Sequence, residues 1–156
     1  MRVFVLSDSH GDMEAIKKAV RLAGDFDRIF HLGDNYRDAL KLAEYTGIAV
    51  DAVAGNCDFV DAPSSSVVVL RGKRFFLTHG HNYGVGFSLT RLKFAAEEAQ
   101  ADVALFGHTH RAYLDYSGSL MLLNPGSISR PRDKKASFAV IEISSEGVIS
   151  AKLHIL

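Results

Sequence analysis

The chain has 156 residues, of which 47% are hydrophobic and 23% are charged, a composition typical of globular proteins. Eighteen basic residues balance eighteen acidic ones, so the chain carries no excess positive charge that would attract a polyanion such as DNA. We therefore expect one domain spanning residues 1–156 and no clear nucleic-acid surface.

The hydrophobic segments and the single cysteine indicate where the protein works. The apolar runs are only a few residues long, whereas a membrane-spanning helix needs roughly 18 or more apolar residues. Cys57 has no partner for a disulfide within the chain, and the N-terminus leads directly into an apolar segment without the pattern of a secretion leader. We expect a cytoplasmic protein that does not enter a membrane.

The first part of the chain alternates between short apolar runs and segments with helical spacing. Val3–Leu6 is apolar throughout, which is typical of a strand buried on both faces. A helix is expected between Asp12, as its N-cap, and Gly24, because apolar residues recur there every three or four positions. The alternation continues with two strands and one helix, at Arg28–Leu32, Ile48–Ala54 and about Asp38–Tyr45. Such units in series favour parallel strand pairing.

Beyond Pro63 the pattern favours antiparallel hairpins. Val67–Leu70 and Arg74–Thr78 are separated only by Arg71-Gly72-Lys73, a spacing suited to a hairpin. The remaining chain adds a helix, a strand and two hairpins, at about Ser88–Gln100, Val103–Phe106, Tyr113–Tyr116 with Leu120–Leu123, and Ser137–Ile143 with Val148–Ile155. The predicted fold is an α/β, two-sheet αββα sandwich of mixed parallel and antiparallel strands, with the helices outside.

Side chains able to bind metal follow five of the predicted strands. These candidate ligands are Asp8, His10, Asp34, Asn56, His79, His108 and His110. Because ligands bind at the carboxyl ends of strands in α/β sheets, we expect the five loops to converge on one patch. Glycines beside the motifs, such as Gly33 before Asp34, suit a backbone that bends sharply near an ion.

The chemistry of the candidate ligands indicates two metal ions. Imidazole, carboxylate and amide groups without a thiolate favour Mn, Fe, Zn, Co or Ni over Ca or Mg, and we expect manganese. Seven ligands exceed the needs of one four-coordinate ion but suit two divalent ions about 3.5 to 4 Å apart. Such a pair activates a bridging water, so that hydroxide can attack phosphorus in line without a protein nucleophile.

The same motifs carry a family resemblance. They are Asp8-Ser9-His10, Gly33-Asp34, Gly55-Asn56, His79 and Gly107-His108-Thr109-His110. In this order they resemble the signature of calcineurin-like metallophosphoesterases, and the small size resembles the YfcE-like phosphodiesterase branch. The segment Asn124-Pro125-Gly126-Ser127, followed by Arg130-Pro131-Arg132, is also similar to that branch.

The resemblance implies a division of the ligands between two ions and hydrolysis of a small phosphodiester. It assigns Asp8, His10 and His110 to the first metal. It assigns Asn56, His79 and His108 to the second metal and makes Asp34 the bridge between the two.

The third motif departs from the wider family. Many members have Asn-His-Asp or Asn-His-Glu there, with the histidine protonating the leaving group, whereas this chain has Asn56-Cys57-Asp58. The YfcE-like branch is similar in having cysteine. A thiol, with an ordinary pKa of about 8.5, is a poor general acid, so we expect a preference for activated aryl phosphodiesters. Cys57 is most simply a packing residue.

Four residues are candidates for catalytic roles, namely Asp34, Asn56, Asp58 and His81. His81 lies two residues after His79 in an expected extended segment, where it could contact the substrate phosphate or be solvated. Asp58 could orient a metal ligand or stabilise a turn. Arg130 and Arg132 could bind phosphate or form a solvated surface, and His31 is expected in the core or behind the ligands.

Three questions stay open at the level of sequence. A metal-dependent nuclease is an alternative that would benefit from a basic track, and none is evident. A non-catalytic interaction module is another, because fold alone does not fix function, although all seven ligand positions hold metal-binding residue types. A homo-oligomer could form through the exposed edges of the C-terminal hairpins.

Overall fold

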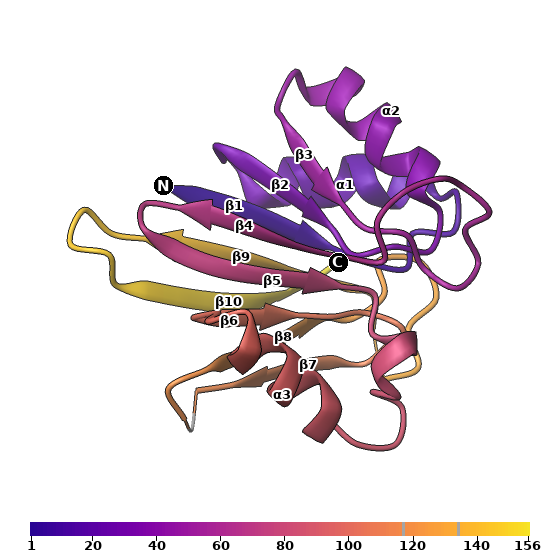
Figure 1. Ribbon diagram of the computed structural model, residues 1–156. Helices are drawn as coiled ribbons and strands as arrows, with labels where there is room; N and C mark the ends of the chain where they lie inside the picture. The colour runs from indigo at the N-terminus through magenta and orange to yellow at the C-terminus, as the bar shows by residue number, and fades with distance from the viewer. Residues whose placement is uncertain (117, 134) are drawn as a thin grey trace.

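Two five-stranded sheets form the centre of the computed structural model, which describes residues 1–116, 118–133 and 135–156 (Figure 1). The first sheet has the order β10-β9-β1-β2-β3, with bounds Ile149–Ile155, Ser137–Ile143, Arg2–Leu6, Arg28–His31 and Val50–Ala52. The second has the order β4-β5-β6-β8-β7, with bounds Ser65–Leu70, Lys73–Thr78, Val103–Leu105, Met121–Pro125 and Ala112–Asp115.

Both sheets combine parallel and antiparallel strands. In the first sheet, β1, β2 and β3 are parallel, and the β9–β10 hairpin is added antiparallel to β1. In the second, β5, β6 and β8 are parallel, while β4 and β7 pair antiparallel at the edges. The predicted parallel units and the three predicted hairpins are therefore confirmed.

In the described part of the chain, three α-helices cover the outer faces of the sheets. α1 (Met13–Ala23) and α2 (Tyr36–Thr46) lie beside the first sheet, and α3 (Thr90–Glu98) lies beside the second (Figure 1). The predicted cap of α1 is confirmed, because the Asp12 side chain accepts a hydrogen bond of 2.9 Å from the backbone N–H of Ala15. Within the described residues no helix combines the length and apolar character needed to cross a membrane.

Alternating side chains of β1 explain why the whole strand is apolar. Val3 and Val5 point into the core between the sheets, where they join Phe30, Phe75 and buried residues of β6, β8 and β9. Phe4 and Leu6 point the other way and pack under the first two helices, whose buried side chains include Ile16, Ala19 and Leu42. A third core lies under α3, around Phe76, Leu92 and Ala104. The predicted αββα sandwich is thus confirmed.

Two connections differ from the predicted ones. The β4–β5 turn has only Arg71 and Gly72 as its central residues, both with positive φ (49° and 75°), because Lys73 already belongs to β5. Positive φ at both positions matches the twist of a hairpin. The segment after His79 is not extended: His81–Tyr83 forms a 3₁₀ turn, η1, started by Gly80 at φ 104°. The extended segment predicted for His81 was therefore wrong.

Candidate metal centre

The seven predicted ligands follow the carboxyl ends of strands in both sheets and meet at one edge of the sandwich. Asp8, Asp34 and Asn56 follow β1, β2 and β3, whereas His79 follows β5 and the last two histidines follow β6. Ligand atoms of four residues lie within 4.8 Å of one another, namely those of Asp8, His10, Asp34 and His110. The predicted convergence is therefore present in the fold.

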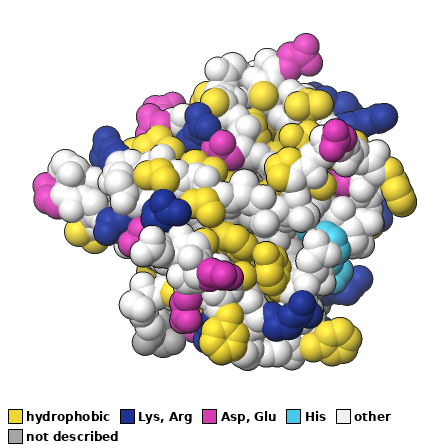
Figure 2. All heavy atoms as spheres, in the orientation of Figure 1, with side chains coloured by type: hydrophobic (Ala, Val, Ile, Leu, Met, Phe, Trp, Pro, Cys, Tyr) yellow, Lys and Arg dark blue, Asp and Glu magenta, His cyan; other side chains and the backbone are white. Residues whose placement is uncertain are grey.

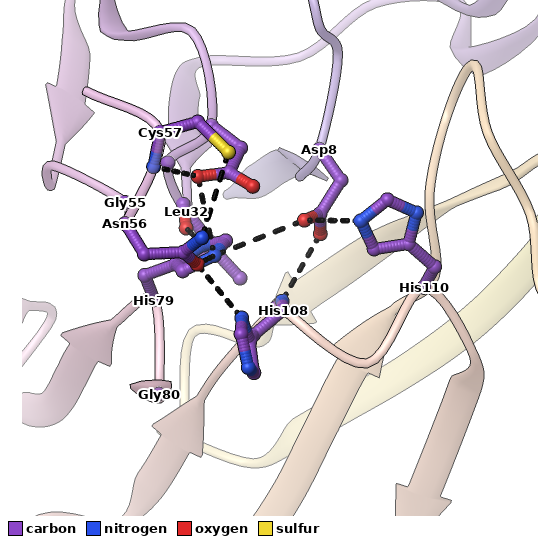
Figure 3. Close-up of polar contacts among 12 residues, drawn as sticks. Asp8, Leu32, Gly55, Asn56, Cys57, His79, Gly80, His108 and His110 are labelled. Carbon is purple, nitrogen blue, oxygen red and sulfur yellow. Dashed lines mark hydrogen bonds and ion pairs between the residues drawn. The ribbon is translucent and has the colours of Figure 1, made fainter. Parts of the chain in front are cut away.

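A second group of side chains gathers around the amide of Asn56 (Figure 3). Its Oδ1 lies 3.1 Å from Nε2 of His79 and 2.8 Å from Nδ1 of His108. We call Asn56, His79 and His108 the second ligand group, and Asp8, His10 and His110 the first ligand group.

Asp34 lies between the two ligand groups. Its Oδ2 is 3.7 Å from Nε2 of His10, in the first group. Its Oδ1 is 3.4 Å from Nε2 of His79, in the second group. Each carboxylate oxygen thus faces a different group, which is the arrangement of a carboxylate that bridges two ions.

Backbone carbonyls fix which nitrogen of two imidazoles faces the site. Nδ1 of His79 lies 2.7 Å from the carbonyl oxygen of Leu32, and Nδ1 of His110 lies 2.6 Å from that of Arg130. A carbonyl oxygen can only accept a hydrogen bond, so Nδ1 of each ring carries a proton and Nε2 is the nitrogen that faces the site. Metal-binding histidines are usually oriented by such a contact.

Several hydrogen-bond acceptors face one another in the site, as expected for residues that bind a metal ion. Nε2 of His79 faces Asn56 Oδ1 and Asp34 Oδ1, which are both acceptors. Asp8 Oδ1 is buried without a hydrogen-bond donor among the described residues, and Nε2 of His110 lies 3.1 Å away. Acceptors that face one another in a buried site are unfavourable unless a cation lies between them. Divalent metal ions fit this donor set.

A proton can take the place of a cation beside Asp8. Burial raises the pKa of Asp8, but the contacts with His110 and His79 outweigh it and leave this pKa below its ordinary value. The contact with Asp8 likewise raises the pKa of His110. A metal bound to these two groups would therefore displace a proton.

The backbone at the site is strained. Five of the candidate ligands have positive φ, between 45° and 66°: Asp8, His10, Asp34, His108 and His110. Non-glycine residues rarely adopt this conformation, which costs roughly 1 to 3 kcal/mol each and concentrates at functional sites. The strain is a sign of function that residue types and spacing do not reveal.

Two motif glycines leave room for these ligands. A Cβ at Gly55 would collide with the carboxylate of Asp34, and a Cβ at Gly107 would collide with Ser7 Oγ and approach Asp8 Oδ2 to 2.8 Å. The loops after β2 and β3, and those after β1 and β6, can therefore meet closely only because glycine stands at these positions.

Asp58 holds the bridging loop from behind. Its carboxylate accepts hydrogen bonds from the backbone N–H groups of Asp34, Asn35, Tyr36 and Gly55, at distances of 2.7 to 3.1 Å. The sequence suggested that Asp58 either orients a metal ligand or stabilises a turn. Its hydrogen bonds stabilise the turn and thereby position Asp34 beside Asn56.

A buried chain of hydrogen bonds supports the loop of Asp8 and His10. Nδ1 of His31 accepts from the Gly33 N–H at 3.3 Å, so its Nε2–H donates to Ser9 Oγ at 3.0 Å. Ser9 Oγ donates in turn to Asp38 Oδ2 at 2.7 Å, and the Gly11 N–H donates to the same oxygen at 2.8 Å. Burial lowers the pKa of His31 to about 4, so it is neutral at neutral pH. Sequence reasoning placed His31 correctly but missed Ser9 and Asp38.

The segment Asn124–Ser127 joins the loops of both ligand groups. Asn124 Nδ2 donates to the Gly107 carbonyl at 2.8 Å, next to His108. Ser127 Oγ donates to the Asp8 carbonyl at 2.9 Å. Ser129 Oγ donates to the same carbonyl at 3.0 Å. This motif, noted in the sequence only through resemblance, therefore positions candidate ligands in the loops after β1 and β6.

His81 and Cys57 lie beside the site in different ways. The His81 ring is 5.5 Å from that of His79 and 6.1 Å from that of His108, and its buried Nδ1 lacks a partner in the described part of the chain. Cys57 is exposed as a residue, but its thiol is partly buried. This partial burial and the nearby Asp34 carboxylate raise the pKa of the thiol. The thiol therefore stays protonated at neutral pH, which disfavours a role as nucleophile.

A cavity of about 360 Å³ opens over the ligands. Its walls include ligands of both groups, Cys57, Arg130 and Arg132. The space-filling view shows histidine at the surface of this edge, with Lys or Arg side chains close by (Figure 2). The arginines therefore lie where an anion bound to the site would meet them.

The layered fold and the cluster of carboxylate, imidazole and amide ligands define a metallophosphoesterase. The family model for the calcineurin-like phosphoesterase superfamily domain matches residues 1–146, and the chain belongs to this family. The predicted membership is confirmed.

Named relatives refine this assignment. The chain is 34% identical to the probable metallophosphoesterase YsnB of Bacillus subtilis, over 94% of this chain and 86% of YsnB. It is 29% identical to the phosphodiesterase YfcE of Escherichia coli, over 96% and 92% of the two chains. A crystal structure of a predicted phosphoesterase from Streptococcus pneumoniae has a TM-score of 0.80 at 30% identity, covering 99% of this chain and 97% of that one.

Proposed function

We propose that the protein is a dinuclear-metal phosphodiesterase that hydrolyses a small phosphodiester. The observation that carries this proposal is the position of Asp34, whose two oxygens face separate ligand groups at 3.4 and 3.7 Å. The relatives named as phosphodiesterases support the choice of a diester.

The first ligand group would hold one ion and the second ligand group the other, with Asp34 bound to both. Nitrogen and oxygen ligands without a thiolate favour manganese, and Ni, Fe, Co and Zn suit the same donors. When bound, two such ions polarise the phosphoryl oxygens and activate a water, so that no side chain has to act as nucleophile.

The residues of the chain itself bind and orient the substrate. Arg130 and Arg132 line the cavity, where guanidinium groups attract a phosphodiester anion and neutralise its charge. His81 lies beside His79 and His108, with ring distances of 5.5 and 6.1 Å, and would approach a polar group of the substrate from there. Asp58 would act only through the loop that carries Asp34.

The leaving group receives little help from the chain. Cys57 occupies the position of the expected acid, and its raised pKa makes the thiol a weaker acid than an ordinary cysteine. Because positioned proton transfer typically contributes about 10²- to 10⁴-fold, substrates with good leaving groups should be hydrolysed much faster.

We also propose that residues 1–156 act as one domain in the cytoplasm. Cys57 is the single cysteine of the chain and is free and exposed, whereas secreted proteins commonly pair their cysteines in disulfides. A free cysteine is usual in a reducing compartment.

The experiment combines metal analysis with a series of aryl methyl phosphodiesters assayed in Mn²⁺. We expect close to two ions per chain and a rate that rises steeply as the pKa of the leaving group falls. Asp34→Asn should lose both metal and rate, whereas Asp61→Asn, at an exposed position outside the site, should keep both. A wild-type chain with neither metal nor turnover would indicate a non-catalytic interaction module instead.

A further inference from the structure

A second cavity, of about 470 Å³, adjoins the metal cavity. It lies beside the third core, on the side of the second sheet that α3 covers, between the chain that leads into α3 and strand β7. Val85 and Leu89 form one wall, while Phe106 and Tyr113 form the other. Its volume is within the range of about 300 to 1,000 Å³ that is usual for small-ligand sites.

The two cavities adjoin at one arginine. Arg132 lines both of them. Thr109, in the wall of the second cavity, lies between His108 and His110, which line the metal cavity. A phosphate at the metal centre would therefore be within reach of Arg132, and a substituent on that phosphate could extend past it.

The walls of the second cavity suit a flat, aromatic group. The rings of Phe106 and Tyr113 lie 6.3 Å apart at 54°, and the aliphatic side chains stand opposite. Arg111 and Arg132 add two exposed guanidinium groups, and neither forms an ion pair within residues 1–116, 118–133 and 135–156. Aromatic faces and free guanidinium groups both stack on planar rings.

We propose that this second cavity binds an aromatic substituent of the substrate, a nucleoside or a ring of similar size, while the phosphate occupies the metal cavity. The inference rests on the proposed function and specifies its substrate class. Arg132 would contact the phosphate, and Tyr113 and Arg111 would hold the ring. One cavity accommodates one ring, and the balanced charge of the chain offers no track for a longer polynucleotide.

The test compares the binding of two phosphate monoesters, thymidine 5′-monophosphate and methyl phosphate, to the Mn²⁺-loaded protein by calorimetry. Both carry the same phosphate, and only one carries a ring. We expect thymidine 5′-monophosphate to bind at least tenfold more tightly, as one base stacked on an aromatic side chain typically allows.

Variants test whether the second cavity causes the tighter binding of thymidine 5′-monophosphate. Tyr113→Ala should lower the affinity for thymidine 5′-monophosphate roughly tenfold and leave that for methyl phosphate unchanged, whereas Tyr113→Phe, which keeps the ring, should retain the preference. Tyr45→Ala is the matched control, because Tyr45 is exposed on α2 beside Lys17, outside both cavities. Arg132→Ala should weaken both ligands.

The outcomes separate this inference from the proposed function. If methyl phosphate binds and aryl phosphodiesters are hydrolysed, but thymidine 5′-monophosphate binds no more tightly, the aromatic site is wrong and the phosphodiesterase stands. If neither ester binds and no diester is hydrolysed, both proposals are overturned. A shift of Tyr113→Ala from dimer to monomer, without a change in ligand affinity, would show that a second copy of the chain occupies the cavity.

Discussion

The two ligand groups differ in how firmly the fold holds them. In the first group, Asp8 is fully buried and His110 is 8% exposed, and two serines and a buried hydrogen-bond chain support the loop of Asp8 and His10. In the second group, only His79 is fully buried, while Asn56 is exposed. For the proposed two-ion centre, we therefore expect the buried first group to bind metal more firmly than the exposed second group.

Substitutions in the two groups should therefore have unequal effects. Asp8→Ala removes a ligand from the buried group and should reduce phosphodiester hydrolysis roughly 10³-fold, with loss of both ions. Asn56→Ala removes a ligand from the exposed group and should lose one ion while it retains the other. Metal analysis and turnover of one aryl methyl phosphodiester check both variants. Loss of both ions from Asn56→Ala alone would reverse the proposed order of the groups.

The buried chain behind the first group should make the protein sensitive to acid. The pKa of His31 is lowered to about 4, so the folded state resists a proton that the unfolded chain accepts near pH 6.5. Stability should be fully present above pH 6.5 and should fall by on the order of 3 kcal/mol as the pH drops to about 4.

Denaturant unfolding of the metal-free protein between pH 7 and 4 measures this loss. Carboxylates titrate in the same range, so the comparison with His31→Gln isolates the contribution of the histidine. The slope of stability against pH should be shallower in the variant, and equal slopes would contradict the buried neutral state.

The smallest effect is expected from a substitution behind the candidate ligands, in a residue that only supports their loop. Asp38→Asn keeps the size of the side chain but removes the charge that receives the Ser9 hydroxyl and the Gly11 N–H. Partners behind metal ligands typically contribute about 10- to 100-fold to affinity, so Mn²⁺ should bind more weakly by that factor.

Calorimetric titration with Mn²⁺ checks the affinity of Asp38→Asn. Glu44→Gln, on the same helix α2 but outside the hydrogen-bond chain, serves as the control and should bind as the wild type does. Unchanged affinity in Asp38→Asn would show that the loop of Asp8 needs no support from α2.

The sequence predicted the layers of the fold and the candidate ligands. It did not predict the strained backbone of the ligand loops or the hydrogen bonds that support these loops. Val3–Leu6 and the motif residues are recognisable because burial on two faces and metal binding each require particular residue types. Positive φ at Asp8 or His108 depends on how two loops meet, and Asp38 looked like an ordinary residue near a helix start. The turn at His81 was missed because Gly80 alone redirects the chain. These features arise from tertiary contacts, which local patterns do not encode.

The most direct test of the central claim is the electron paramagnetic resonance spectrum of the protein during titration with Mn²⁺. If Asp34 joins two ions about 3.5 to 4 Å apart, the first equivalent should give the signal of an isolated ion. The second equivalent should replace it with the spectrum of a spin-coupled pair, and Asp34→Asn should never show that spectrum. A wild-type signal that simply doubles in intensity would contradict the bridged centre.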